Sequence, residues 1–370
     1  MINLHWILPS PTPYHDFFFN RLSEESDFNL TVHFADGPIK THPWKEKRAV
    51  KYDSRNFSLR LGIDWEVLRL AQLQHNAILV AGWHRLSLIV LLEWLSVSRH
   101  GFVFVTDTPR VGRGSGWLRS FVRTVIINRI FRSADRVLST GRPGMNALLE
   151  LGCPSAKVGC FPFFVPLPPI PQKSHTCSHK VIRFASSGRL DNAMKGYDVA
   201  IKALGLLKRN GLDNFQYEIA GTGPDLECLK SLVESNGLVD SVFFRGWLEP
   251  ADIGEMLREA DAFIHPARRD PFPVAVLEAM AAAKVVIGSD RSGSVVDRIV
   301  DGVNGFVHRS EDVSDLASKL TRVMLEPELA RQVGSRARKT AEEWPAERGI
   351  AILREIFGGA GRPTDGVKVF

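Results

Sequence analysis

Two carboxylates flank a predicted helix start in the segment 265–280. Asp270 lies in a loop after an apolar run, and Glu278 lies in the apolar run that follows Pro273. Proline favours the start of a helix, where the first amides lack intrahelical partners and can receive a phosphate. Carboxylates accept hydrogen bonds from paired hydroxyls such as those of a sugar. The pattern predicts a phosphate and sugar site, although a loop aspartate and a solvated helix glutamate explain it equally well. The amides concerned are those of Val274 and Ala275.

A second group of residues places two cations after another apolar run, in the segment 186–196. Gly188 allows the chain to turn after the predicted strand, and Arg189 and Lys195 follow it. Two fixed cations in one strand-to-helix connection suit a diphosphate. Ordinary loop charges are the alternative for either cation alone.

A Gly-x-Gly pair at Gly221 and Gly223 also follows a predicted strand. Leu226 stands where the third glycine of a dinucleotide fingerprint belongs, so the sequence gives little support for an NAD site. A tight turn into a helix accounts for the pair better.

Apolar β-type runs alternate with helical runs along almost the whole chain of 370 residues. This alternation is typical of parallel sheets covered by helices on both faces, and the length favours two domains. The fold class expected is therefore α/β, with two Rossmann-like domains. Strands are expected at 2–8, 30–34, 77–80, 102–105, 136–139 and 158–161, and then at 181–186, 217–220, 242–244, 262–265 and 285–288. Helices are expected at 86–97 and 117–130, and from Lys195 and Pro224.

The proline-rich stretch after residue 165 predicts the domain linker, because repeated prolines continue neither a helix nor a central strand. We expect an N-terminal acceptor-binding domain and a C-terminal donor-nucleotide-binding domain, followed by a helix that returns to the first domain. Their bounds are 1–165, 166–180 for the linker, 181–340 and 341–370.

Charge and cysteine content argue against a nucleic-acid-binding protein and against a zinc protein. The net charge of +6 lies in the first half, since residues 1–165 hold 20 Lys/Arg against 13 Asp/Glu. The excess is modest and no nucleic-acid recognition motif appears, so we expect no nucleic-acid partner. The four cysteines form no zinc-type spacing, and no signal-like leader or apolar span stands out, which predicts a cytoplasmic protein.

The helix expected at 117–130 suggests a peripheral contact with a membrane. Its apolar residues share one face that arginines flank, as in helices that lie on anionic lipid. A core-facing helix with surface arginines is the alternative. The apolar residues are Trp117, Leu118, Phe121, Val122, Val125 and Ile126.

Several short segments, in this order, resemble the C-terminal domain of retaining GT-B glycosyltransferases of glycosyltransferase family 4. The matching segments are 188–196, 221–224, 243–247, 270–280 and 301–305. The first half is similar to that family more loosely, at 107–108, 133–135, 151–152 and 161–162. The resemblance implies the GT-B fold, with two parallel sheets that face each other across a cleft.

The resemblance also implies roles for individual residues. Arg189 and Lys195 correspond to the cations that grip the donor diphosphate, and Glu278 to the acid that binds ribose hydroxyls. Asp107 is similar to the position that reaches the donor sugar or the acceptor hydroxyl. The donor-binding residues expected are Gly188, Arg189, Lys195, Gly246, Trp247, Asp270, Pro273, Val274, Ala275 and Glu278. The acceptor-binding residues expected are Tyr14, His15, Trp83, His84 and Asp107, although Tyr14 and His15 could equally start the first helix. The catalytic residues expected are Arg189, Lys195, Asp107 and Asp270.

Two departures from the family pattern concern the donor side. Asp270 stands where the family usually has glutamate, so its carboxylate reaches about 1.5 Å less far towards a transferred sugar. Ala283 and Val285 replace a usual glycine and proline, but both residue types are compatible with the strand expected there.

The activity implied is transfer of a sugar from a UDP-, GDP- or ADP-sugar to a saccharide or lipid-linked acceptor, in polysaccharide or glycoconjugate synthesis. The anomeric configuration would be retained by front-face attack, in which the departing phosphate takes the acceptor proton. No Asp-x-Asp triplet occurs, so neither a metal nor another cofactor is expected. A GT-B epimerase or hydrolase of sugar nucleotides, or a silent nucleotide-sugar-binding scaffold, are the alternatives.

Overall fold

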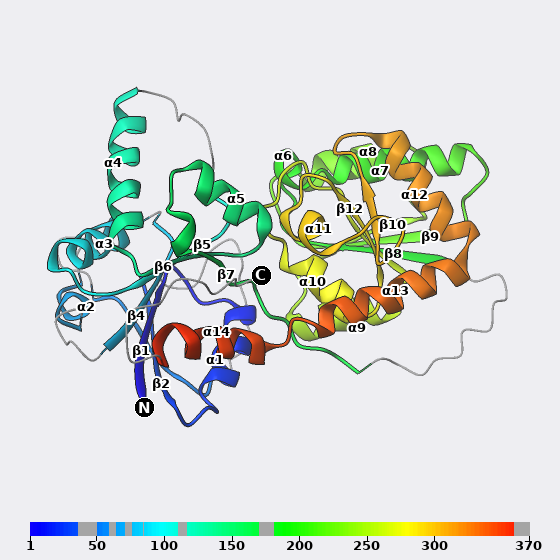
Figure 1. The fold of residues 1–370 in the computed structure, drawn as a ribbon. Coiled ribbons are helices and arrows are strands. Elements are labelled where there is room, and N and C mark those ends of the chain that lie inside the picture. The colour runs from blue at the N-terminus through cyan, green and yellow to red at the C-terminus, as the bar shows by residue number, and fades with distance from the viewer. Residues whose placement is uncertain are drawn as a thin grey trace. The chain divides into compact units, whose positions relative to one another are not determined.

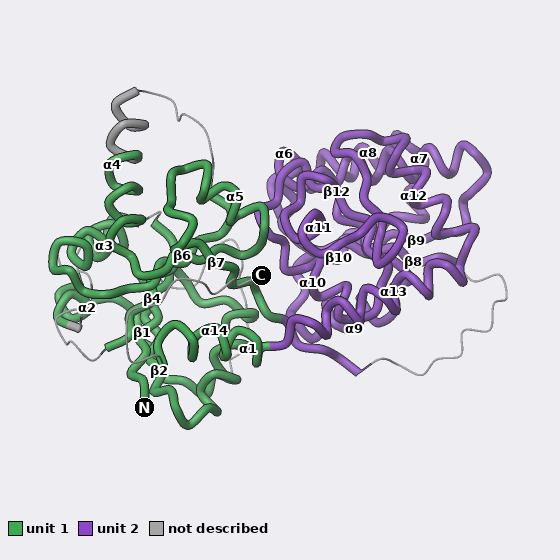
Figure 2. Tube along the Cα trace, viewed as in Figure 1, with its two compact units in different colours: residues 1–164, 346–370 green, residues 165–345 purple. Residues whose placement is uncertain are grey.

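The chain divides into two compact units in the computed structural model (Figure 2). The structure describes residues 1–35, 50–58, 64–70, 76–83, 85–109, 117–169 and 181–358, without the side chains of 70 and 117–123. Residues 1–164 with 346–370 form unit 1, and residues 165–345 form unit 2. Each unit is an α/β layer structure built on one parallel sheet, so the two Rossmann-like domains expected from the sequence are present (Figure 1). Most of the linker expected at 166–180 lies outside the described residues.

Unit 1 has a parallel sheet of order β3-β2-β1-β4-β5-β6-β7. Its strands are β1 Ile2–Leu8, β2 Phe28–Phe34, β3 Asp53–Asn56, β4 Asn76–Ala81, β5 Val103–Thr106, β6 Arg136–Ser139 and β7 Val158–Cys160. Its helices are α1 Pro13–Leu22, α2 Trp65–Leu70, α3 Leu86–Ser98, α4 Trp117–Ser133, α5 Arg142–Glu150 and α14 Ala346–Gly358, with a short 3₁₀ turn at Ser155–Lys157. The sequence did not indicate β3, because this edge strand is short and polar.

Two apolar layers cover the sheet of unit 1. On one face, strand residues such as Trp6 pack against Phe19 of α1 and Ile350 of α14. On the other face, residues such as Phe104 pack against Leu92 of α3 and others of α2, α4 and α5. Both faces are buried, as the near-continuous apolar runs of a parallel sheet require.

A row of polar side chains with the buried His33 at its centre crosses β1, β2 and β3. Arg55 Nε donates to His33 Nδ1 at 2.7 Å, and His33 Nε2 lies 3.0 Å from His5 Nδ1. Because Arg55 can only donate, His33 must accept at Nδ1 and carry its proton on Nε2. Burial, with the charges of Arg55 and His5, lowers the pKa of His33 to about 3.

We therefore expect acid to destabilise unit 1 well before its carboxylates titrate. A histidine pKa that is lower in the folded state than in the unfolded state stabilises the fold above the unfolded value of 6.5, and this contribution is lost as pH falls. Between pH 7 and 5 the loss should be about 2 kcal/mol. Urea unfolding at both pH values measures it. The His33→Gln variant should lose clearly less, and an equal loss in both proteins would contradict this account.

Unit 2 has a six-stranded parallel sheet of order β10-β9-β8-β11-β12-β13. Its strands are β8 Ile182–Ser187, β9 Phe215–Ala220, β10 Val242–Gly246, β11 Ala262–His265, β12 Val285–Ser289 and β13 Phe306–His308. Its helices are α6 Asn192–Lys195, α7 Tyr197–Arg209, α8 Leu226–Ser235, α9 Pro250–Glu259, α10 Val274–Ala281, α11 Gly293–Arg298, α12 Val313–Leu325 and α13 Pro327–Glu342. One apolar cluster joins the sheet to α7, α8 and α12, and another joins it to α9, α10 and α11.

Two helix starts in unit 2 differ from the sequence predictions. The helix expected from Lys195 begins at Tyr197, because Gly196 adopts a left-handed φ of 65° and ends α6. The helix expected from Pro224 begins at Leu226, after Asp225. The strand expected after Ala283 forms, and Ala283 itself has a φ of 58°, the conformation that explains the usual glycine.

No helix within the described residues is long and apolar enough to cross a membrane.

Candidate active site

The order in which the chain adds strands to the unit 2 sheet reverses between β8 and β11. The chain passes from β8 to β9 on one side and later returns to β11 on the other, so the loops after β8 and β11 adjoin. Ligands of open parallel sheets bind at such a point. Arg269 N donates to Met194 O at 3.1 Å, and a Cβ on Gly196 would overlap the carbonyl oxygen of Pro266. The two loops are therefore held in direct contact.

This junction brings Lys195 and Asp270 together as an ion pair. His265 Nε2 lies 3.2 Å from the same Asp270 oxygen. Burial alone would raise the pKa of Asp270, but the contact with His265 and the charge of Lys195 outweigh it and lower the pKa to about 2. Asp270 is thus ionised at neutral pH and forms an ion pair with Lys195, although the sequence analysis gives the two residues different roles, towards the transferred sugar and the diphosphate.

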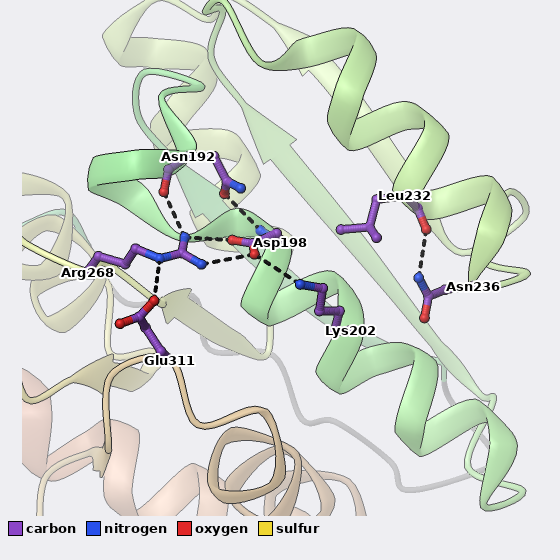
Figure 3. Close-up of polar contacts among 7 residues, drawn as sticks. All are labelled: Asn192, Asp198, Lys202, Leu232, Asn236, Arg268 and Glu311. Carbon is purple, nitrogen blue, oxygen red and sulfur yellow. Dashed lines mark hydrogen bonds and ion pairs between the residues drawn. The ribbon is translucent and has the colours of Figure 1, made fainter.

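Arg268 fixes the loop that carries Asp270 (Figure 3). Its guanidinium donates to both oxygens of Asp198, at 2.7 and 2.9 Å, and to the carbonyl of Asn192 at 2.8 Å. A third side-chain nitrogen donates to Glu311 at 2.9 Å. These contacts tie the loop after β11 to α6 and the start of α7, which lie on either side of Gly196.

Replacing Arg268 with alanine should destabilise unit 2 by about 2 kcal/mol. The reason is that Asp198, whose side chain is 13% exposed, then keeps Lys202 as its one cationic partner among the described residues. The midpoint of thermal unfolding measures the change. Arg331→Ala is the matched control, because Arg331 pairs with Glu328 on the exposed surface and such pairs contribute little. An equal fall in the unfolding midpoint of both variants would show that the contacts of Arg268 stabilise unit 2 no more than an exposed ion pair does.

Arg189 provides an accessible cation of the junction. It is exposed, and within the described part of the chain no hydrogen bond or ion pair engages its guanidinium. Gly188 has a φ of 146°, and a Cβ there would lie 3.9 Å from Lys195 Nζ. A Cβ at this position would also lie 3.1 Å from the Tyr197 hydroxyl, so the absence of a side chain lets the backbone of Gly188 lie close to the Lys195 amine.

The start of α10 supplies the amides predicted from the sequence. Pro273 precedes the helix as its N-cap, and Val274 and Ala275 form its first turn. The carbonyl of Pro273 accepts a hydrogen bond from Ser294 at 3.0 Å, which fixes the helix start. Glu278 lies one turn further along, and burial raises its pKa to about 7.

Gly246 and Trp247 lie at the end of β10, the edge strand of the sheet. Gly246 has a φ of 68°, and its carbonyl accepts from Gly221 N at 2.6 Å. Trp247 Nε1 donates to Glu249 at 3.1 Å. β9 and β8 separate this position from β11, so it sits further along the same edge than Lys195 and Asp270.

The acceptor residues expected from the sequence follow three neighbouring strands of unit 1. Tyr14 and His15 begin α1 after β1, and Tyr14 packs against Phe163 with ring centroids 4.7 Å apart. Trp83 follows β4 and stacks on Phe104. Asp107 follows β5 and accepts from Thr140 at 2.9 Å. His84 lies outside the described residues.

The contacts of His265 and Arg268 are not predictable from the sequence. The sequence indicates His265 only as the end of a strand and Arg268 only as one of several loop residues. Their partners Asp270 and Asp198 are charged residues whose proximity depends on the fold, so residue type alone could not single them out.

Residues 172–340 match the family profile described as Glycosyl transferases group 1. The matched range contains β8 to β13 and every residue of the unit 2 junction described above. It covers somewhat less than half of the chain.

Curated relatives include two glycosyltransferases of exopolysaccharide synthesis. The amylovoran biosynthesis glycosyltransferase AmsK of Erwinia amylovora is 32% identical over 53% of this chain and 49% of its own length. A protein named as putative colanic acid biosynthesis glycosyltransferase WcaL, of Salmonella typhimurium, is 28% identical over 62% of this chain and 57% of its own length. The matches thus span about half the length of these relatives.

Solved structures extend the likeness over both units. HepE of Anabaena, crystallised in complex with UDP, superposes with a TM-score of 0.77 at 15% identity, over 96% of this chain and 100% of its own. The lipopolysaccharide outer core galactosyltransferase WaaB gives a TM-score of 0.69 at 15% identity, over 96% and 99% of the two chains. This chain therefore has the GT-B fold.

Proposed function

We propose that this protein is a glycosyltransferase that moves a sugar from a nucleotide-diphosphate donor to a saccharide or lipid-linked acceptor. The observation that carries the proposal is the match of residues 172–340 to group 1 glycosyl transferases, in the unit that holds Arg189, Lys195 and the start of α10 at one sheet edge. Cations and free helix amides at one edge suit a diphosphate.

The donor is proposed to be a UDP-, GDP- or ADP-sugar, bound by unit 2. Arg189, Lys195 and the amides of Val274 and Ala275 hold the diphosphate, and Glu278 accepts from the ribose hydroxyls. Gly246 and Trp247 contact the base, and Asp270 faces the transferred sugar. Uridine is favoured among the bases because HepE was solved with UDP and with UDP-glucose.

The acceptor is proposed to bind unit 1 through Tyr14, His15, Trp83, His84 and Asp107. A polysaccharide intermediate or its lipid-linked form is favoured, because AmsK and WcaL carry names from amylovoran and colanic acid synthesis. Peripheral association with the inner face of the membrane would bring the protein to such an acceptor.

We further propose that the sugar keeps its anomeric configuration. The acceptor oxygen attacks the anomeric carbon from the side of the departing diphosphate, the new carbon–oxygen bond forms as the bond to phosphate breaks, and a phosphate oxygen takes the acceptor proton. Arg189 and Lys195 stabilise the charge that develops on that phosphate, which is where fixed cations lower a barrier.

The same assignment predicts a reaction that needs no divalent metal. Because two cations and a helix start supply the positive field at the diphosphate, adding EDTA should leave the initial rate of donor consumption unchanged. A rate abolished by EDTA and restored by magnesium or manganese would contradict this expectation.

Nuclear magnetic resonance of the reaction mixture tests the function as a whole. Purified protein is incubated with one nucleotide sugar, with and without an oligosaccharide acceptor, and the product anomer is assigned from its coupling constant. We expect donor consumption that depends on acceptor, and a product with the donor's configuration. An inverted product would refute retention, and donor consumption without acceptor would favour a sugar-nucleotide epimerase or hydrolase.

A further inference from the structure

The outer side of α3 in unit 1 carries an apolar stripe that the described protein does not cover. Leu86 and Val97 are each 69% exposed, and Trp94 is 39% exposed. With Val90 these residues recur every three or four positions, so they share one face of the helix. We call Leu86, Val90, Trp94 and Val97 the α3 outer face.

The opposite side of α3 is already used by the fold. Leu88, Leu91, Leu92 and Leu95 are buried in the core of unit 1. The helix is thus apolar on both sides, whereas a surface helix normally turns polar residues outward. Helix α2 neighbours α3 in unit 1 (Figure 1). Its Trp65 is also 53% exposed. An uncovered apolar face of this kind marks an interaction site.

The charge around the α3 outer face is positive. Arg85 and Arg99 lie at its two ends, and both are exposed. The acidic residue of α3, Glu93, is ion-paired to Arg129 of α4 at 2.7 Å. Helix α4, which packs against α3, also carries the exposed Arg132.

We infer that the α3 outer face docks unit 1 on a lipid bilayer that contains anionic lipid. Tryptophan and aliphatic side chains partition into the boundary between headgroups and acyl chains, while flanking arginines reach anionic headgroups. A second copy of this chain would bring the same arginines face to face, which like-charge repulsion disfavours. The sequence also suggested a membrane contact at α4. Of that face only Val125 and Ile126 have described side chains, so the α4 contact stays a prediction. This inference rests on the peripheral membrane association included in the proposed function and names the surface that makes it. Flotation needs no nucleotide sugar, so its failure would be distinguishable from a failure of the proposed sugar transfer.

Flotation of the full chain with vesicles tests the inference. The vesicles are phosphatidylcholine alone, and phosphatidylcholine mixed with phosphatidylglycerol. We expect the protein to float with the anionic vesicles, and Leu86→Asp/Val97→Asp to bind them at least about tenfold more weakly. Both positions are highly exposed, so the substitutions leave the core intact. The matched control is Val239→Asp/Val300→Asp, whose positions in unit 2 are 58% and 61% exposed and which should float like the parent protein.

A charge reversal separates the electrostatic contribution. Arg132→Glu should weaken binding to anionic vesicles, whereas Arg209→Glu on α7 of unit 2, with the same change of net charge, should have a clearly smaller effect. Absence of flotation at low salt would overturn the inference, as would equal flotation of the α3 variant and its control. A dimer in size-exclusion chromatography that Leu86→Asp/Val97→Asp dissociates would overturn it in favour of self-association.

Discussion

Replacing Arg189 with alanine is expected to slow sugar transfer by about 10- to 100-fold at subsaturating donor. In the account given above, this guanidinium makes a charged hydrogen bond to the diphosphate that strengthens as charge moves onto the leaving phosphate. Lys195 cannot compensate fully, because it is already paired with Asp270. Initial rates of nucleotide release measure the effect.

The fold should tolerate this substitution. Arg189 is exposed and no contact with the described residues engages its guanidinium, so its removal disturbs no packing. Arg209→Ala, an exposed arginine in the last turn of α7, is the control and should keep the parent rate. An unchanged rate in the Arg189 variant would exclude the guanidinium from the reaction, whereas a lowered melting temperature would indicate a structural role instead.

Gly196→Ala is expected to lower the free energy of unfolding of unit 2 by about 3 kcal/mol or more. The residue has a left-handed φ of 65°, which costs an alanine about 1 kcal/mol. Its Cβ would in addition overlap the carbonyl oxygen of Pro266, and a backbone carbonyl cannot rotate away as a side chain can. Chemical unfolding at neutral pH measures the loss.

Gly237 offers a matched control for this second effect. Its φ is 66°, but nothing lies within 4 Å of a Cβ placed on it. Gly237→Ala should therefore show only the conformational cost, about 1 kcal/mol. If both variants lose the same stability, the loops after β8 and β11 are not in the close contact described here.

Most strands of both sheets were predictable because they depend on local pattern. A buried parallel strand such as β12 begins with an apolar run, and Gly188 and Pro273 mark the turns after β8 and β11. β3 and β13 were missed, since a four-residue polar strand and a three-residue strand show no periodicity.

The electrostatics of the site could not be predicted in the same way. Lys195 and Asp270 are 75 residues apart in the sequence, and Arg268 and Asp198 are 70 apart. Only the junction of two loops reveals that these charges neutralise each other. His265 contacts Asp270 because β11 ends at His265 and the loop that follows folds Asp270 back against it.

Thermal unfolding in the presence of nucleotide sugars tests the central claim most directly. The parent protein and Arg189→Ala are each melted with a panel of UDP-, GDP- and ADP-sugars. A ligand that binds only the folded state raises the melting temperature by mass action. We predict that one base class, with UDP favoured, stabilises the parent protein by several degrees and the variant clearly less. If no member of the panel shifts the parent protein, unit 2 does not bind a nucleotide-sugar donor and the proposed transfer reaction is contradicted.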